Sequence, residues 1–502
     1  MGRAPAFPPV IPKPLAVAPG RGAFELGPSA RIHVDGRNAE AVRVARFLAE
    51  RLRPATGFRL PVSVKRRPAA AGDVVLALAP GNRSLGDEGY RVRVEPGLVR
   101  LDARTPAGLF YAVQTLRQLL PAAVESPRRQ PGPWRIGVLT IHDRPRFGWR
   151  GLMLDVARHF FDVGEVKRLI DLMSLYKLNR LHLHLTDDQG WRIAIRSRPN
   201  LTRVGASTAV GGGPGGHYTR RRYAELVKHA RRRFVDVVPE VDMPGHVNAA
   251  LTSYAELTPD GVAAAPYTGI EVGFSSLSIR KESTYAFVDD VLGELAALTP
   301  GRYLHVGGDE PLSTEPEDYR FFVERVQRIV HSHGKRAILW EEAARARLRR
   351  SAVIQHWHDP ELARRAVGQG AKLVLSPSTR VYLDMKYDRD SPHGLEWAGL
   401  TNVRKAYDWD PSGVVAGISE RDVLGVEAPL WSETIDTRAG LDWLAFPRLL
   451  GVAEAGWSPA GRNWREYRMR LAEHGPRLEA LGVGFHRAAG IPWPEVGRNP
   501  RK

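Results

Sequence analysis

Two carboxylates stand side by side in residues 305–310, which read HVGGDE. The preceding apolar residues predict a short buried strand, and Gly307 and Gly308 allow backbone dihedrals that a side chain would hinder. Adjacent residues on a regular strand point to opposite faces, so Asp309 and Glu310 can address one ligand only if the chain turns there. We therefore expect an acid and base pair at a strand end, suited to proton transfer on a bound small molecule.

Further polar and aromatic side chains follow other apolar stretches of the chain. They are Asp187, Asp188, Trp191, Glu240, Asp242, His246, Trp340, Glu341, Glu342, Trp357, Trp431 and Glu433. Indole rings stack on the apolar faces of sugars, while carboxylates accept hydrogen bonds from sugar hydroxyls. Their joint position at strand ends predicts a carbohydrate substrate.

The elements that must hold these residues begin near Trp149, where apolar stretches alternate with amphipathic helical patterns. This alternation is typical of parallel βα units. The predicted strands are 150–156, 180–185, 235–241, 303–306, 337–340, 353–357, 373–376 and 423–430. Eight such strands predict an α/β fold with a (β/α)8 TIM barrel, which carries its chemistry at the carboxyl ends of the strands.

A smaller α/β domain is expected before the barrel. The alternating segments 90–94 and 98–102 flank Pro96-Gly97 and predict a hairpin, and a helical pattern follows over 107–120. Residues 121–133, rich in Pro and Arg, are typical of a linker. We predict a noncatalytic α/β domain at residues 1–140 and a catalytic barrel at residues 141–502.

Composition excludes several classes of function. The chain contains no cysteine, which excludes disulfides, thiolate metal sites and cysteine nucleophiles. With 43% hydrophobic residues it resembles an ordinary globular protein, and it lacks the apolar run of about 18 residues that a membrane span requires. The first 20 residues are interrupted by prolines and predict no secretory signal in the chain as given, so the compartment is left open.

A net charge of +18 raises the question of a nucleic-acid partner. The arginines are spread over several predicted helices rather than gathered in one stripe with interleaved aromatic residues. We therefore predict neither a nucleic-acid partner nor a membrane partner, and make no prediction for the oligomeric state.

Seven ordered motifs make the chain closely similar to the family 20 glycoside hydrolases, the β-N-acetylhexosaminidases, over nearly its full length. The motifs are RGLMLDVARHF (150–160), LHLHLTDDQGWRI (181–193), VVPEVDMPGH (237–246), HVGGDE (305–310), LWEE (339–342), YLD (382–384) and APLWSE (428–433). Residues 88–116 also resemble the noncatalytic N-terminal domain of that family.

This resemblance implies an exo-acting, retaining hydrolase that removes terminal N-acetylglucosamine or N-acetylgalactosamine from oligosaccharides without a metal or cofactor. The acetamido group of the substrate would act as nucleophile and form an oxazolinium intermediate, since this family is an exception to the usual pair of flanking carboxylates. Glu310 would be the general acid and base, Asp309 would orient and stabilise the acetamido group, and Tyr382 would hold its oxygen. His246 would support Glu310 with Asp187, although the adjacent Asp188 remains an alternative partner.

The resemblance also implies a set of substrate-binding residues. Trp340, Trp357 and Trp431 would enclose the acetamido methyl group, and Trp397 would stack on the leaving-group sugar. Arg150, Asp384 and Glu433 would bind the outer hydroxyls of the terminal sugar.

Two other functions fit parts of the sequence. His182 and His184 form an HxH pattern that a metal-dependent barrel hydrolase could use, with His246 and a carboxylate as further ligands. A sugar-binding barrel without catalysis would keep the tryptophans but would not need Asp309, Glu310 and Tyr382 together.

Overall fold

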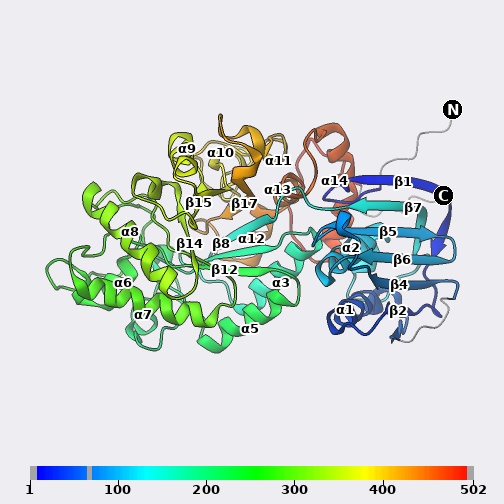
Figure 1. Ribbon diagram of the computed structural model, residues 1–502, viewed down its shortest axis with the longest axis horizontal. Helices are drawn as coiled ribbons and strands as arrows, with labels where there is room; N and C mark the ends of the chain where they lie inside the picture. Colours follow the sequence, from blue (N-terminus) through cyan, green and yellow to red (C-terminus); the bar gives the residue numbers. More distant parts are fainter. Residues whose placement is uncertain (1–7, 65–69, 495–502) are drawn as a thin grey trace. The chain divides into compact units, whose positions relative to one another are not determined.

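The computed structural model describes residues 8–64 and 70–494 (Figure 1). Contacts divide the chain into two compact units, Met1–Arg146 with Leu175–Lys177 and Ala453–Lys502, and Phe147–Ser174 with Leu178–Val452. Residues 1–7, which belong to the segment without a predicted secretory signal, lie outside the described residues.

The first unit contains a seven-stranded mixed sheet in the order β1-β7-β5-β6-β4-β2-β3. Its strands are β1 Ala16–Glu25, β2 Ile32–Asp35, β3 Val62–Ser63, β4 Asp73–Leu78, β5 Tyr90–Glu95, β6 Leu98–Ala103 and β7 Arg135–Asp143. The predicted hairpin is β5 and β6, which pair antiparallel with Val92 opposite Leu101. Helices α1 Ala39–Thr56 and α2 Pro106–Leu119 pack on each other and on the sheet. The prediction of a smaller α/β domain is confirmed.

The predicted domain boundary needs correction at the C-terminal end. The sequence predicts that the barrel extends to the end of the chain, but the described residues 453–494 cluster with the first unit, as do residues 141–146. Helix α14 Trp464–Ala480 provides the physical reason, because the guanidinium of Arg477 contacts Glu125 Oε1 at 3.0 Å and donates to the carbonyl of Leu120 at 2.7 Å. A helical pattern alone does not reveal which unit the helix joins.

The second unit is a closed barrel of eight parallel strands in the order β12-β13-β14-β15-β16-β17-β8-β9. The strands are β8 Trp149–Asp155, β9 Arg180–His184, β12 Asp236–Glu240, β13 Tyr303–His305, β14 Arg336–Trp340, β15 Val353–His356, β16 Lys372–Leu375 and β17 Val423–Leu430. All eight predicted strands are present. The prediction of a (β/α)8 barrel is confirmed.

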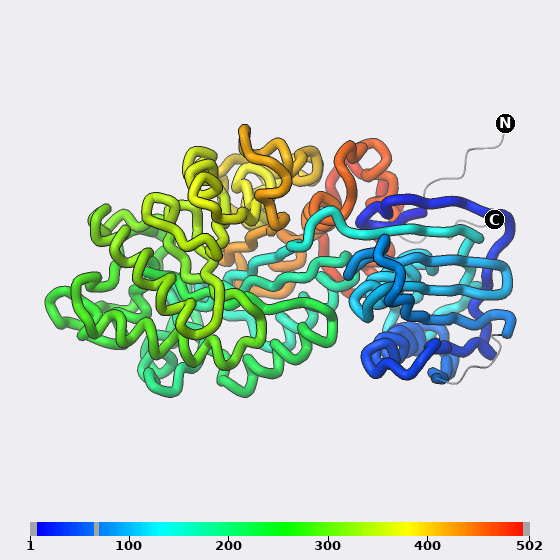
Figure 2. The backbone as a smooth tube through the Cα atoms, in the orientation of Figure 1, coloured from blue at the N-terminus to red at the C-terminus, as the bar shows by residue number. Residues whose placement is uncertain are grey.

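Helices follow the strands along the chain, and Figure 2 traces this path as a continuous tube. They are α3 Val163–Leu175, α4 Asn200–Arg203, α5 Arg220–Arg231, α6 Asn248–Ser253, α7 Glu282–Leu298, α8 Pro316–Ser332, α9 Pro360–Gly368, α10 Ser378–Val381, α11 Val403–Tyr407, α12 Arg438–Ala445 and α13 Arg448–Trp457. A short hairpin, β10 Thr186–Asp187 with β11 Gly190–Trp191, lies directly after β9. Among the described residues, none of the helices has the length and apolar character needed to span a membrane.

The barrel core explains the apolar strand sequences. Trp149, Val238, Ile338, Val353 and Val374 form one buried cluster inside the barrel. Buried parallel strands require apolar residues on both faces, which is why the sequence shows near-continuous apolar runs there. The carboxyl ends of these strands carry the polar residues described next.

Candidate active site

The loop after β13 turns as the two glycines predict. Gly307 and Gly308 have φ angles of 66° and 99°, and Glu310 also lies in the left-handed region at 42°. A Cβ atom on Gly307 would come within 1.6 Å of Asp242 Oδ1, so only glycine fits there. The turn gives the adjacent carboxylates different surroundings, because the Asp309 side chain is 11% exposed whereas the Glu310 side chain is 33% exposed.

Asp309 and Glu310 line a pocket of about 430 Å³ at the carboxyl ends of the barrel strands. The lining residues are Arg158, Ile270, Val272, Asp309, Glu310, Trp357, His358, Tyr382, Leu395, Trp397, Trp431 and Glu433. The half-exposed Ile270 and Val272 come from a long loop between α6 and α7, and no pattern in the sequence marked them. The pocket thus combines carboxylates with an aromatic wall.

The aromatic wall is built by stacked and edge-on rings. Trp357 stacks on Tyr382 with ring centroids 6.3 Å apart, and Trp397 meets Tyr382 edge-on at 5.6 Å. Trp340 lies behind the lining, packed with Tyr382 and Trp431 in one buried cluster. These rings form an apolar enclosure, which the exposed Trp397 extends toward solvent.

A histidine links Glu310 to a second buried carboxylate. His246 Nε2 lies 3.4 Å from Glu310 Oε2, and His246 Nδ1 lies 3.2 Å from Asp187 Oδ1. Burial alone would lower the pKa of His246, but Asp187 and Asp309 raise it well above its usual value. Asp188 instead accepts hydrogen bonds from Ser275 Oγ and the Asn248 amide, so Asp187 is the partner of His246.

Asp309 is paired with Asp242, a residue of the β12 loop. Burial raises the pKa of Asp309 well above the usual carboxyl range, and the charge of Asp242 raises it further. Burial also raises the pKa of Asp242, to about 7. One carboxyl oxygen of each residue lies within 4.8 Å of the other, and two carboxylates this close in a buried site resist ionising together.

Glu341 and Glu342, which follow β14, have different surroundings. Glu341 accepts the amides of Trp357 and His358 and so anchors the loop that carries Trp357. Glu342 accepts the Trp357 indole N–H at 3.3 Å. Burial, with the charges of Asp309 and Glu341, raises the pKa of Glu342 to about 8.

The arginine of the pocket is Arg158, not Arg150. Arg150 lies at the amino end of β8, is fully buried, and donates to the carbonyl of Phe147, so its predicted contact with substrate is wrong. Arg158 follows the carboxyl end of the same strand and contacts Asp187 Oδ2 at 2.8 Å and Glu433 Oε1 at 3.9 Å. Both arginines belong to the motif RGLMLDVARHF, and position relative to the strand end could have selected Arg158.

Two acidic residues keep unused acceptors: Glu433, which lines the pocket, and Asp384, whose pKa responds to the charge of Glu433. Both carboxyl oxygens of Asp384 and Oε2 of Glu433 are buried without a hydrogen-bond partner among the residues that the structure describes. Burial, and then the charge of Glu433, raises the pKa of Asp384 well above its usual value. Buried acceptors of this kind are normally satisfied, and the hydroxyls of a bound ligand could satisfy them.

His182 and His184 point into the barrel core. His182 contacts Glu240 and Glu427, and His184 contacts Glu240 and Asp187, so each uses both ring nitrogens on carboxylates. The HxH pattern is thus part of a buried network of histidines and carboxylates in the barrel.

Comparisons with known proteins agree with this geometry. Residues 147–318 and 312–460 match the catalytic domain of glycosyl hydrolase family 20, and residues 7–144 match domain 2 of that family. A β-N-acetylhexosaminidase of Cellulomonas fimi is 42% identical over 98% of each chain. The structure of a family 20 β-N-acetylhexosaminidase from Streptomyces coelicolor aligns with a TM-score of 0.94 at 52% identity, covering 97% of this chain and 99% of the other. A mutant Streptomyces plicatus β-hexosaminidase, solved in complex with its product GlcNAc, aligns equally well at 52% identity over 98% and 99% of the two chains.

Proposed function

The chain belongs to glycosyl hydrolase family 20 and is a glycoside hydrolase of the β-N-acetylhexosaminidase type, and from this membership we propose that it removes single terminal N-acetylglucosamine or N-acetylgalactosamine residues with retention of configuration. The substrates would be oligosaccharides with a β-linked N-acetylhexosamine at the nonreducing end. The product GlcNAc in the S. plicatus structure supports this choice of sugar.

The reaction would proceed in two steps through the substrate's own acetamido group. In the first step the acetamido oxygen forms a bond to the anomeric carbon while the glycosidic bond breaks and Glu310 donates its proton to the leaving oxygen. In the second step Glu310 removes a proton from water, which attacks the anomeric carbon and opens the oxazolinium ring. Two inversions at one carbon give net retention.

The observation that carries this mechanism is the position of the two acids. Asp309 and Glu310 are neighbours on one loop that lines the pocket, so they are poorly placed to flank a glycosidic bond as acid and nucleophile. Asp309 lies within the buried part of the site and would act as counter-charge to the oxazolinium ion. The hydroxyl of Tyr382 would donate a hydrogen bond to the acetamido oxygen. Trp340, Trp357 and Trp431 would enclose the methyl group.

The remaining polar residues would fix the outer side of the sugar. Arg158, Asp384 and Glu433 together offer one cationic donor and several unused acceptors, which suits sugar hydroxyls. Trp397, 53% exposed, would stack on the leaving-group sugar.

The test compares p-nitrophenyl N-acetyl-β-glucosaminide and N-acetyl-β-galactosaminide with p-nitrophenyl β-glucoside, which lacks the acetamido group. We expect hydrolysis of the first two and no hydrolysis of the third. In a series of substrates with one, two or three fluorine atoms on the acetyl group, kcat should fall with each added fluorine, because fluorine makes the acetamido oxygen a weaker nucleophile. Equal rates across that series, or equal cleavage of the glucoside, would overturn the mechanism.

A further inference from the structure

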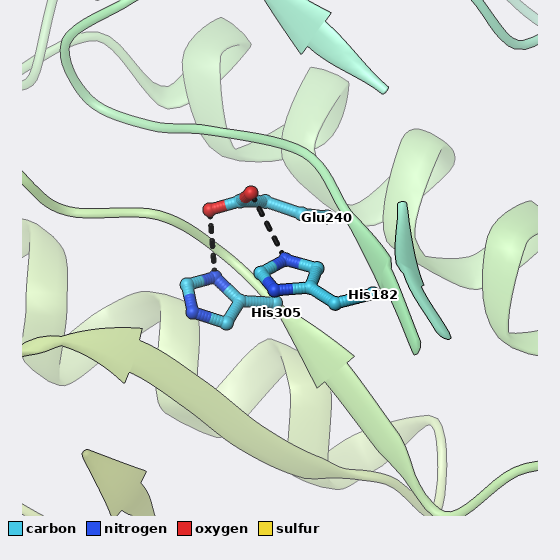
Figure 3. A group of neighbouring side chains, drawn as sticks. All are labelled: His182, Glu240 and His305. Atoms are coloured by element: carbon cyan, nitrogen blue, oxygen red, sulfur yellow. Dashed lines mark ion pairs between the residues drawn. The ribbon is translucent and has the colours of Figure 1, made fainter. Parts of the chain in front are cut away.

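The carboxylate of Glu240 is the centre of a set of close contacts with ring nitrogens in the barrel core. It lies at the end of β12 and is fully buried. Its contacts are His305 Nδ1 at 2.8 Å and Trp340 Nε1 at 2.9 Å on Oε1, and His182 Nε2 at 3.0 Å and His184 Nδ1 at 2.5 Å on Oε2. Figure 3 shows the carboxylate facing the two rings of His182 and His305.

These contacts fix both the charge and the orientation of Glu240. Burial would raise its pKa, but His305, His184 and His182 hold it well below the usual carboxyl value. Two of the four contacts, from His184 and Trp340, are hydrogen bonds, and those of His182 and His305 are ion-pair distances. The Glu240 carboxylate is therefore enclosed by nitrogens of the protein and acts through the groups that it contacts.

One oxygen of Glu240 supports the wall of the pocket. Oε1 accepts the indole N–H of Trp340, whose ring packs with Tyr382 and Trp431. This wall is the proposed enclosure of the acetamido group. A buried indole N–H that loses its acceptor is destabilised, so the ring would turn to find another acceptor.

The other oxygen supports the proposed acid. Oε2 contacts His184, whose Nε2 contacts Asp187 Oδ2 at 2.9 Å. Asp187 in turn presents Oδ1 to His246, which lies beside Glu310. Carboxylate and imidazole thus alternate without a break from Glu240 to the acid.

We propose that Glu240 is a positioning residue that couples the acetamido enclosure to the acid, because its two oxygens hold Trp340 and His184 in one fixed geometry. This inference rests on the proposed function. A shift of Glu240 would displace the Trp340 ring, which confines the acetamido group. It would also displace His184 and so the contacts that orient Glu310. The two steps of the reaction would therefore respond together.

The test uses Glu240→Gln, which keeps the shape of the side chain but replaces one carboxylate oxygen by an amide NH2 group. The two ring nitrogens that contact that oxygen then lose their acceptor. Two measurements report separately on the acetamido enclosure and on the acid. The Ki of a thiazoline mimic of the cyclic intermediate reports the enclosure, and the ratio of kcat/KM for 2,4-dinitrophenyl and 4-methylumbelliferyl N-acetyl-β-glucosaminide reports the acid. We expect the Ki to rise at least about tenfold and the ratio to change at least about fivefold in the same direction as in Glu310→Gln.

Glu427→Gln is the matched control. Glu427 is equally buried and bonds Trp149, His182 and Gln355. It shares His182 with Glu240 but contacts neither Trp340 nor His184, the two groups on which the inference rests. Glu427→Gln should lower the melting temperature and change both kinetic readouts much less than Glu240→Gln does. If Glu240→Gln folds and changes the readouts no more than Glu427→Gln does, the inference is wrong.

A double-mutant cycle covers the case in which Glu240→Gln does not fold. Trp340→Phe removes the indole donor to Oε1, and His184→Gln alters the contact to Oε2 together with the contact to Asp187 Oδ2. Their effects on kcat/KM should depart from additivity by at least about threefold, because both act through Glu240. Additive effects would overturn the inference, whereas failure of the wild type to cleave N-acetylated substrates would overturn the proposed function itself.

Discussion

One carboxyl oxygen of Asp309 and one of Asp242 lie within 4.8 Å of each other in the buried part of the site. Two carboxylates this close resist ionising together, so the pair favours keeping a proton. Asp309 would serve as counter-charge to a cation, which would lower the pKa of Asp309 and leave that proton on Asp242 during the reaction. Asp242 keeps a proton only below the pH at which it ionises, and its pKa is about 7.

We predict that Asp242→Asn extends the active pH range on the alkaline side. In the wild type, kcat should fall as the pH rises through about 7, because ionised Asp242 adds a second negative charge beside Asp309. The asparagine amide is neutral at every pH, so this fall should be absent in the variant. Profiles of kcat from pH 5 to 9 with a chromogenic substrate check the prediction, and a fall at the same pH in both proteins would contradict it.

Arg158 and Arg150 form a natural pair for a second prediction. Arg158→Lys should raise KM and lower kcat/KM by about 10- to 100-fold, because a charged contact to substrate is worth about 1.5 to 3 kcal/mol. Arg150→Lys should lower the melting temperature with kcat/KM near the wild-type value, since Arg150 lies at the opposite end of β8. Steady-state kinetics together with thermal unfolding distinguish the two. A larger kinetic effect at Arg150 than at Arg158 would reverse the assignment.

This pair also shows which parts of the site a sequence can predict. All eight barrel strands were predictable because each is buried on both sides and leaves an apolar run. The positions of Asp309 and Glu310 were predictable because Gly307 and Gly308 indicate a turn at a strand end. The choice between Arg150 and Arg158 needed the direction of β8, and the motif alone does not give it.

Other features required three-dimensional contacts that no local pattern contains. The choice of Asp187 over Asp188 depends on hairpin β10–β11, which presents Asp187 to His246 and Asp188 to Ser275. The membership of α14 in the first unit depends on Arg477 and Glu125, which lie far apart in the sequence. Asp242 lay in a matched motif, but its role became visible only through its contact with Asp309.

Glu342 supports a prediction about stability. Its pKa is raised to about 8 in the folded protein, whereas an unfolded glutamate titrates near 4.5. A raised pKa means that the contribution of Glu342 to stability is full below pH 4.5 and is lost as the pH rises toward 8. Glu342→Gln should therefore gain unfolding free energy relative to the wild type between pH 5 and 8, on the order of a few kcal/mol.

Denaturant unfolding of both proteins at pH 4.5, 6 and 8 measures this difference. The surface variant Glu361→Gln is a suitable control, because Glu361 is exposed and should give the same difference at every pH. A constant difference between wild type and Glu342→Gln would show that Glu342 is ionised throughout.

Glu310→Gln and Asp309→Asn should differ in their dependence on the leaving group. Without Glu310, no proton reaches the leaving oxygen, so kcat/KM should fall by about 10²- to 10⁴-fold with 4-methylumbelliferyl N-acetyl-β-glucosaminide. The loss should be much smaller with the 2,4-dinitrophenyl substrate, whose leaving group departs without a proton. Asp309→Asn should lower kcat/KM by a similar factor with both substrates, because the acetamido group must attack in each case. Equal losses for both substrates in Glu310→Gln would remove Glu310 from the role of acid and leave Asp309 as the better candidate.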